Sequence, residues 1–267
     1  MKRILYIVLL ATVLLAGCNS SFIFGTDEAV PRVQPVFAGY QIPPNFVPQA
    51  LVITALGDSL SQGVGDEENR GGYVGRLASE MRDWPGVYGV GVENTAKRGR
   101  RSDQLLAMFQ KGELTGPVTE ADYIVMTIGG NDIMRIVKRD LFNLNIEAFQ
   151  EELIFYENRY RNIYAAIRSM NQHAPLIVIG LYNPFSLITD EINEFDTIIT
   201  AYNDAMETAL TEDPQACFVP VEDLFEGNEN LVYHTDFFHP NGNGYGLMQE
   251  RIVERMGECG LVFDDRG

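Results

Sequence analysis

Short apolar segments alternate with amphipathic segments along most of this chain, and this alternation constrains the fold more than any other feature. Five apolar segments are rich in valine and isoleucine and have the length of β-strands; they cover residues 51–56, 87–92, 123–128, 176–181 and 217–221. They are apolar on both faces, which is typical of parallel strands covered by helices on each side. We therefore expect an α/β fold: a three-layer α/β/α sandwich around a five-stranded parallel sheet.

Helical patterns follow these strands, at roughly residues 72–82, 101–111, 147–171, 193–211 and 242–257. In the longest of them, apolar residues recur at steps of three and four between Phe149 and Met170 and form one face of a helix. We interpret Tyr156 and Tyr160 on that face as core residues. Ligands of such sheets bind beyond the carboxyl ends of the strands, so catalytic residues are expected in the segments that directly follow the strands.

The N-terminus has the pattern of an export signal. Lys2 and Arg3 precede an apolar run over residues 4–15, which is too short to cross a bilayer comfortably. The run ends in small residues directly before Cys18, and in this respect it resembles a bacterial lipoprotein signal. The resemblance implies cleavage before Cys18 and lipid attachment to its thiol. A plain secretory signal and an uncleaved anchor are the alternatives.

These features predict the organisation of the chain. Residues 1–17 are expected to be a lipoprotein signal peptide, residues 18–50 a proline-containing tether, and residues 51–267 one catalytic domain. The protein is then exported and anchored to the outer face of the bacterial cell membrane through a lipid on Cys18. One lipid-bearing cysteine with two or three acyl chains is enough for stable anchoring.

Charge and cysteine content narrow the possible partners. The formal net charge of −17 disfavours nucleic acid as a partner. If Cys18 carries lipid, Cys217 and Cys259 remain; they form either a disulfide, which an exported protein permits, or two buried thiols. The three histidines are scattered and no Cys-x-x-Cys spacing occurs, so we expect no metal site.

Residues of catalytic type follow four of the five predicted strands: Ser59 in Gly57-Asp58-Ser59-Leu60, Gly99, Asn131 in Gly129-Gly130-Asn131-Asp132, and the pair Asp236 and His239. A serine hydroxyl attacks a carbonyl only when a base accepts its proton and a third group orients the base. His239 suits the base, and Asp236 lies three residues before it. The backbone N–H groups of Ser59 and Gly99 and the side-chain amide of Asn131 are suitable donors to an oxyanion.

In these four blocks the sequence resembles the SGNH hydrolases, also called GDSL esterases or lipases, and in particular their bacterial lipoprotein members. The resemblance covers about residues 51–245 and is loosest around Gly99. It implies a flavodoxin-like sheet, Ser59 as the nucleophile, His239 as the base and Asp236 as its orienting acid. It also implies an oxyanion hole made by Ser59, Gly99 and Asn131.

The same resemblance implies an activity. We expect a serine esterase that hydrolyses carboxylic esters through an acyl-enzyme, without a cofactor. Its substrate is a short acyl ester, a lysophospholipid, a thioester or an acetyl group on a glycan. The alternative is a catalytically idle lipoprotein that binds lipid or glycan with a hydrolase fold. An α/β-hydrolase elbow is disfavoured because position 61 is serine where that motif needs glycine.

Several other residues carry open alternatives. Arg100 and Arg101, in a basic cluster with Lys97 and Arg98, either contact an anionic group of the substrate or belong to a solvated loop paired with acids. Residues 133–146 and 183–192 either shape an acyl pocket or lid, or pack onto the core. His234 either contacts substrate or is a loop residue. Two aspartates, Asp58 and Asp132, are expected to hold loops by accepting backbone N–H groups.

Overall fold

The computed structural model describes residues 47–139, 145–184, 193–226, 232–236 and 238–262. The predicted signal peptide, Cys18 and nearly all of the predicted tether lie outside this part of the chain, and they stay predictions. Among the described residues, no helix combines the length and apolar character needed to cross a membrane.

The central sheet has five strands, all parallel, as the sequence predicts. Their order across the sheet is β2-β1-β3-β4-β5. The strands are β1 (Gln49–Gly57), β2 (Val87–Asn94), β3 (Tyr123–Thr127), β4 (Leu176–Ile179) and β5 (Ala216–Val219). β5 is shorter than its predicted apolar run and stops before Pro220, which has no N–H to donate to a ladder.

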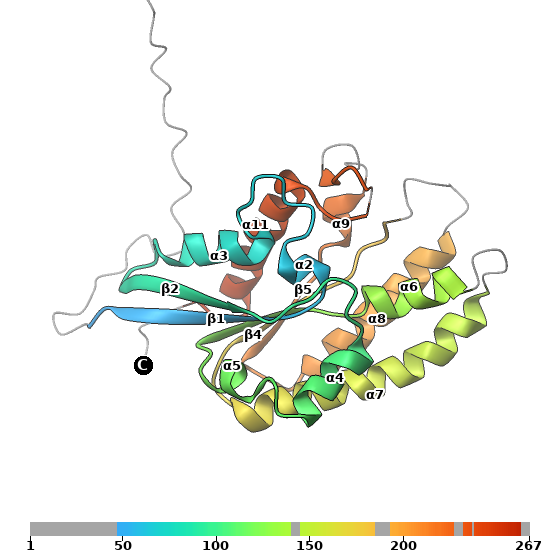
Figure 1. Ribbon diagram of the computed structural model, residues 1–267, viewed down its shortest axis with the longest axis horizontal. Helices are drawn as coiled ribbons and strands as arrows, with labels where there is room; N and C mark the ends of the chain where they lie inside the picture. The colour runs from blue at the N-terminus through green and yellow to red at the C-terminus, as the bar shows by residue number, and fades with distance from the viewer. Residues whose placement is uncertain (1–46, 140–144, 185–192, 227–231, 237, 263–267) are drawn as a thin grey trace, which may run out of the picture. The chain divides into compact units, whose positions relative to one another are not determined.

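Helices cover both faces of the sheet (Figure 1). α3 (Gly72–Met81) and α11 (Gly242–Glu258) lie on one face, and α4 (Ser102–Gln110), α7 (Ile146–Met170) and α8 (Asn193–Leu210) lie on the other. These are the five predicted helices, so the predicted three-layer α/β/α sandwich is confirmed. The described residues add α2 (Ser59–Gln62), α5 (Thr115–Thr119), α6 (Gly130–Arg139) and α9 (Glu222–Phe225).

The main core lies between the sheet and α7 and α8. Leu56 of β1 and Met126 of β3 are fully buried there against the apolar face of α7. Tyr156 and Tyr160 of α7 are also fully buried, which confirms their predicted place in the core. The Tyr156 hydroxyl donates to the Ile128 carbonyl at 2.9 Å, so α7 supports the chain directly after β3. This hydrogen bond helps to position the backbone directly after β3.

β2 differs from the expectation that every strand is covered on both faces. It forms one edge of the sheet, and most of its residues are exposed, including Tyr88 and Val92. A Cβ atom on Gly89 would meet no other atom within 4 Å. The expectation is wrong here because the apolar run of β2 resembles those of the central strands. The burial of an edge strand also depends on how far the flanking helices extend towards that edge, which the apolar run does not show.

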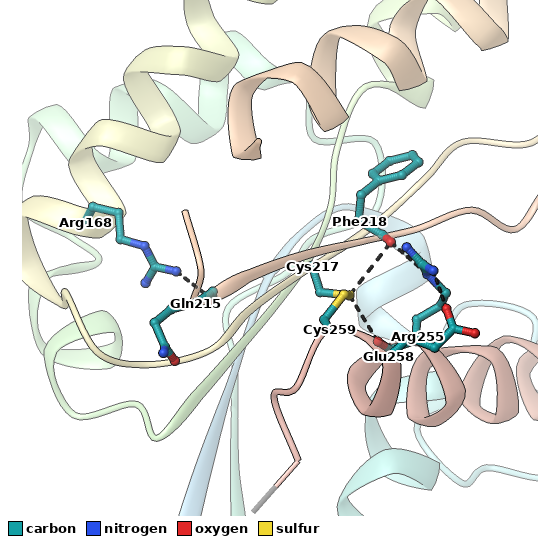
Figure 2. Close-up of a disulfide and its surroundings, with 7 residues drawn as sticks. All are labelled: Arg168, Gln215, Cys217, Phe218, Arg255, Glu258 and Cys259. Atoms are coloured by element: carbon teal, nitrogen blue, oxygen red, sulfur yellow. Dashed lines mark hydrogen bonds and ion pairs between the residues drawn. A yellow bond between two sulfur atoms is a disulfide. The ribbon is translucent and has the colours of Figure 1, made fainter. Parts of the chain in front are cut away.

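Cys217 of β5 and Cys259, which directly follows α11, form a disulfide (Figure 2). Of the two alternatives left open by the sequence, the disulfide is therefore the one found. Cys217 is buried, and the Arg255 side chain donates to the Phe218 carbonyl beside it. The bond ties the far end of the last helix to the edge strand β5.

Removal of this disulfide should lower stability without loss of catalysis. The cysteines are 42 residues apart, and closing a loop of that length in the unfolded chain stabilises the folded state by about 2–4 kcal/mol. We expect a double variant, Cys217→Ala with Cys259→Ala, to unfold several degrees below wild type in non-reducing buffer. Reduced wild type is the matched control and should unfold close to the variant. Equal Tm values for oxidised wild type and the variant would contradict the prediction.

Candidate active site

A close approach between two strands determines where Ser59 lies. Gly57, the last residue of β1, has φ +108°, and a Cβ atom there would lie 1.8 Å from the Thr127 carbonyl oxygen of β3. Glycine alone permits this contact. The next residue, Asp58, accepts hydrogen bonds from Leu60 N at 3.1 Å and from Thr127 Oγ1 at 2.8 Å. It thereby caps α2, and Ser59 begins that helix in a buried position.

Two segments far apart in the sequence meet at Ser59. His239 Nε2 lies 2.9 Å from Ser59 Oγ, across 180 residues of chain. His239 Nδ1 lies 2.6 Å from an Asp236 carboxylate oxygen. The ring of His239 is thus held between a hydroxyl and a carboxylate. This is the geometry that a nucleophilic serine requires of its base and orienting acid.

Asp236 is held as a carboxylate. Partial burial opposes its charge, but hydrogen bonds from His239 N at 2.9 Å, from the His239 ring and from Phe238 N at 3.1 Å outweigh burial. Together they lower the pKa of Asp236 to about 2. At neutral pH the carboxylate therefore accepts the proton that His239 carries on Nδ1, and this selects the tautomer that presents Nε2 as a proton acceptor to Ser59.

The side chains beneath Ser59 are polar and form hydrogen bonds to one another. The sequence does not predict this network. Ser61 Oγ lies 2.6 Å from the Tyr73 hydroxyl and 2.8 Å from Thr127 Oγ1. These contacts attach α2 to α3 on one side and to β3 on the other. In the sequence, Ser61 indicates only that the nucleophile motif is not that of an α/β-hydrolase. In the structure, Ser61 anchors α2, the helix that carries Ser59.

Asn131 lies at the start of α6, directly after β3. It lines the same pocket as Ser59, and its side-chain nitrogen donates to the Arg100 carbonyl at 3.1 Å. The neighbouring Asp132 accepts hydrogen bonds from Ser102 N at 3.0 Å and Ser102 Oγ at 2.7 Å. The predicted roles of Asp58 and Asp132 in accepting backbone N–H groups are therefore confirmed. Asp132 joins the segment after β3 to the start of α4.

Gly99 lies in the exposed loop of residues 95–101 after β2, with φ +81° and open space around it. Backbone bonds bring this loop to the Ser59 turn: Lys97 N donates to the Gly57 carbonyl at 3.0 Å. Arg98 N donates to the Gln62 side chain at 2.6 Å. Gly99 is not among the residues that line the pocket beside Ser59. Its predicted oxyanion role stays a prediction.

The four cations of this loop have different environments. The Arg100 guanidinium donates to the Thr95 carbonyl at 2.6 Å and to the Gly57 carbonyl at 3.2 Å. Arg101 pairs with Asp103 at 2.9 Å. Lys97 and Arg98 are exposed, and within the described part of the chain neither forms an ion pair. Arg100 and Arg101 are thus engaged by the protein itself.

An apolar pocket opens beside Ser59 and Asn131. Its wall comes from α6, α8, the segment after β4 and the segment before α11. The apolar lining residues are Leu60, Ile133, Met134, Leu181, Tyr182, Pro184, Phe195, Ile199 and Phe238. The first part of the predicted segment 133–146 therefore shapes the pocket, and so does Pro184 of the predicted segment 183–192. Residues 140–144 and 185–192 lie outside the described residues. The contributions of α8 and Phe238 were not predicted.

His234 stands next to the site without contacting Ser59 within the described structure. Its backbone N–H donates to the His239 carbonyl at 2.8 Å, and its ring lies 3.9 Å from the Asp236 carboxylate. These contacts favour the reading of His234 as a loop residue.

The chain is similar to known proteins in both sequence and fold. The model of the GDSL-like lipase/acylhydrolase family matches residues 55–247. The uncharacterized protein YpmR of Bacillus subtilis (strain 168) is 40% identical over 213 residues, which cover 79% of this chain and 83% of that protein. The spore germination lipase LipC of Bacillus licheniformis is 28% identical over 206 residues, covering 76% of this chain and 94% of the lipase. The crystal structure of the lipase Lip_vut3 from a goat rumen metagenome superposes with a TM-score of 0.68 at 27% identity, covering 79% of this chain and 98% of that lipase.

Asp58, buried at the edge of the pocket, should make stability depend on pH in a distinctive direction. Burial raises its pKa from 3.8 to about 6, although hydrogen bonds from Thr127 and Leu60 oppose the shift. Between about pH 4 and pH 6 the folded state then binds more protons at this site than the unfolded chain does. The Asp58 contribution to the free energy of unfolding therefore falls as pH rises through this range, by on the order of 3 kcal/mol.

The variant Asp58→Asn keeps a side-chain oxygen that accepts the same two hydrogen bonds but cannot titrate. We expect the free energy of unfolding of wild type, relative to that of Asp58→Asn, to decrease between about pH 4 and pH 7 in urea titrations. Asp223→Asn is the control, because Arg251 lowers the pKa of Asp223 and its effect lies at more acidic pH. Parallel pH profiles for wild type and Asp58→Asn would refute the prediction.

Proposed function

The chain belongs to the GDSL-like lipase/acylhydrolase family, whose members are serine ester hydrolases, and we propose that it cleaves carboxylic esters through an acyl-enzyme on Ser59. The observation that carries this proposal is the continuous arrangement of Asp236, His239 and Ser59. A continuous line of hydrogen bonds from a carboxylate through an imidazole to a buried hydroxyl is what nucleophilic catalysis by serine needs.

In the first half of the reaction, Ser59 Oγ attacks the ester carbonyl carbon while His239 Nε2 takes the hydroxyl proton. Asp236 stabilises the imidazolium that forms, and it stays ionised because its pKa is about 2. The tetrahedral intermediate then expels the alcohol, which receives the proton from His239. In the second half a water molecule, deprotonated by His239, attacks the acyl-enzyme. The bond to Ser59 Oγ then breaks, His239 returns the proton to Ser59 Oγ, and the carboxylic acid is released.

The oxyanion needs donors that are in place before the attack. We propose Ser59 N, Gly99 N and the Asn131 side chain for this role. Ser59 is the first residue of α2, where backbone N–H groups have no partner in the preceding turn. Asn131 uses its side-chain nitrogen once, towards Arg100, and an amide nitrogen carries a second hydrogen that can point to the substrate. Gly99 is supported by the attachment of its loop to Gly57.

The pocket favours an acyl chain over an acetyl group. Most of its lining side chains are apolar, as in sites that bind apolar groups. An acetyl group would leave most of this apolar surface in contact with water, whereas each CH₂ buried is worth about 0.8 kcal/mol. Among the expected substrates we therefore propose a fatty-acyl ester. The lipase names of LipC and Lip_vut3 agree with this choice.

We further propose that the enzyme acts outside the cell, anchored through a lipid on Cys18. The signal-like N-terminus motivates this proposal. The disulfide between Cys217 and Cys259 supports it, since disulfides persist mainly in oxidising compartments. A lipid anchor would keep the site close to membrane-derived esters.

The sheet order separates two sides of the reacting carbonyl. Ser59 follows β1; the acyl pocket lies towards the segments after β3 and β4, and the cationic loop follows β2 on the opposite side. With the acyl chain in the pocket, the leaving alcohol points towards residues 95–101. We propose that an anionic group on this alcohol meets Lys97 and Arg98, rather than Arg100 and Arg101, which the protein already engages.

A probe of the nucleophile tests the proposed function. Ser59→Ala should fold with an unchanged Tm and lose hydrolysis of p-nitrophenyl esters, because no other hydroxyl meets His239 Nε2 in the described site. A fluorophosphonate probe should label wild type and leave Ser59→Ala unlabelled. Wild type should prefer medium-length acyl chains to acetate. If wild type neither reacts with the probe nor turns over any ester, an idle binding lipoprotein is favoured instead, and full activity of Ser59→Ala would overturn the assignment.

A second measurement tests the cationic loop. For the double variant Lys97→Gln with Arg98→Gln, we expect KM to rise about two- to tenfold for a monoacylglycerol phosphate, since each exposed charge contact is worth up to about 1 kcal/mol. KM for the neutral monoacylglycerol should not change, and the difference should shrink at high salt. Arg161→Gln, which removes an exposed cation from α7, is the matched control. Equal effects on both substrates would exclude the contact.

A further inference from the structure

The segment after α2 contains a motif, Gly63-Val64-Gly65-Asp66, that the proposed mechanism does not use. We propose that residues 63–70 form a rigid support that holds His239 against Ser59, and that the buried ion pair of Asp66 and Arg76 locks this support. The proposal rests on the proposed function, because it assigns a positioning role towards His239.

The segment that carries His239 has little regular structure of its own. In the described residues it contributes one isolated bridge, between Tyr233 and Pro240, before α11 begins at Gly242. On one side, the Tyr182 hydroxyl donates to the Phe238 carbonyl at 2.7 Å. Hydrogen bonds within the segment, such as the one from His234 N to the His239 carbonyl, fix its local shape. Its position relative to Ser59 depends on its neighbours, and the neighbour on its other side is the support of residues 63–70.

The support touches this segment at His239 and directly after it. A Cβ atom on Gly65 would lie 2.6 Å from the Pro240 carbonyl oxygen and 3.0 Å from His239 Cβ. The backbone of Gly65 is therefore packed against the base itself. Next to it, the Tyr245 hydroxyl donates to the Val64 carbonyl at 2.7 Å. The Glu67 side chain accepts from Gly242 N at 2.9 Å.

The Asp66 carboxylate organises the support from inside. It accepts backbone hydrogen bonds from Arg70 N at 3.0 Å and Gly72 N at 2.8 Å. Arg76 of α3 binds both carboxylate oxygens, at 2.6 and 3.0 Å. The two side chains are only 1% and 2% exposed. Burial opposes the charge of Asp66, but the bonds from Arg76 and Gly72 outweigh it and lower its pKa.

Such a pair is suited to holding a loop in one place. A bidentate contact between Arg and a carboxylate fixes orientation as well as distance. If Asp66 and Arg76 separate, each is left as an uncompensated buried charge, which is strongly unfavourable. A shift of the loop that would separate the two side chains is therefore opposed. Arg76 also donates to Glu68 at 2.8 Å, which extends the lock to the residue beside Glu67. The path from α3 to His239 thus runs through Arg76, Asp66 and Gly65.

Two glycines of similar backbone geometry allow a matched test. Gly65 has φ +94° and Gly71 has φ +81°, so Gly→Ala causes similar backbone strain at both positions. A Cβ on Gly71 would have its nearest neighbour at 3.5 Å, an ordinary contact, whereas the one on Gly65 would collide with the His239 segment. The pair separates backbone strain from displacement of the base.

We expect Gly65→Ala to lower kcat for a neutral p-nitrophenyl ester by about 10²-fold, since misplacement of a catalytic group by about 1 Å has this effect. KM should stay within about twofold of wild type, because the acyl pocket is on another wall. Gly71→Ala should have a similar Tm and keep kcat within about threefold of wild type. Arg76→Lys, which keeps the charge but loses the bidentate contact, should show an intermediate loss in kcat at unchanged KM.

Each outcome is decisive. A folded Gly65→Ala with wild-type kcat, an equal loss in Gly71→Ala, or a parallel rise in KM would overturn the support. If Gly65→Ala does not fold, Arg76→Lys decides: a lower kcat at constant KM supports the proposal and an unchanged kcat overturns it. Failure of the proposed function itself has a different signature, because wild type would then neither hydrolyse esters nor react with a fluorophosphonate.

Discussion

The contact between the ends of β1 and β3 is the constraint on which the rest of the site depends. Gly57 approaches the Thr127 carbonyl so closely that no side chain fits between the strands, and Asp58 N donates to the same carbonyl at 3.1 Å. Thr127 in turn donates its hydroxyl to the Asp58 carboxylate. Because Ser59 follows β1 and Asn131 follows β3, this contact between the strand ends determines how far apart the two residues lie. The positions of the remaining groups are adjusted to it.

Four carboxylates hold the loops of the site, and their pKa values shift in different directions for a physical reason. Burial dominates at Asp58 and Asp132, where it outweighs the hydrogen bonds that each carboxylate accepts, so the pKa of each is raised. Asp66 has a guanidinium and two backbone donors, and Asp236 has two backbone donors and the His239 ring, so both pKa values are lowered. The two carboxylates with lowered pKa values are those that support His239, one through its ring and one through the loop behind it.

The order of strands also gives the site a direction. Ser59 follows β1 and lies between an apolar pocket on the side of β3 and β4 and an exposed basic loop after β2. A substrate with a hydrocarbon chain on one side of the ester and a charged group on the other would match both walls. The chain as a whole is strongly acidic, so this local positive charge is a feature of one edge of the sheet and not of the surface in general.

The sequence by itself determined the sheet, the main helices and the candidate catalytic residues. Strand and helix periodicity is a local property, and the carboxyl ends of parallel strands share one edge, so Ser59, Asn131 and the Asp236–His239 pair were expected together before any distance was known. Distances between segments were decided only by the tertiary structure. It paired Cys217 with Cys259, engaged Arg100 with backbone carbonyls, left β2 at an exposed edge, and brought Phe195 and Ile199 to the pocket. These outcomes depend on how helices pack across the sheet, which no short pattern encodes. The same holds for Asp66 and Arg76: their spacing of ten residues carries no signal, and they form a lock only because α3 folds back over the loop that supports His239.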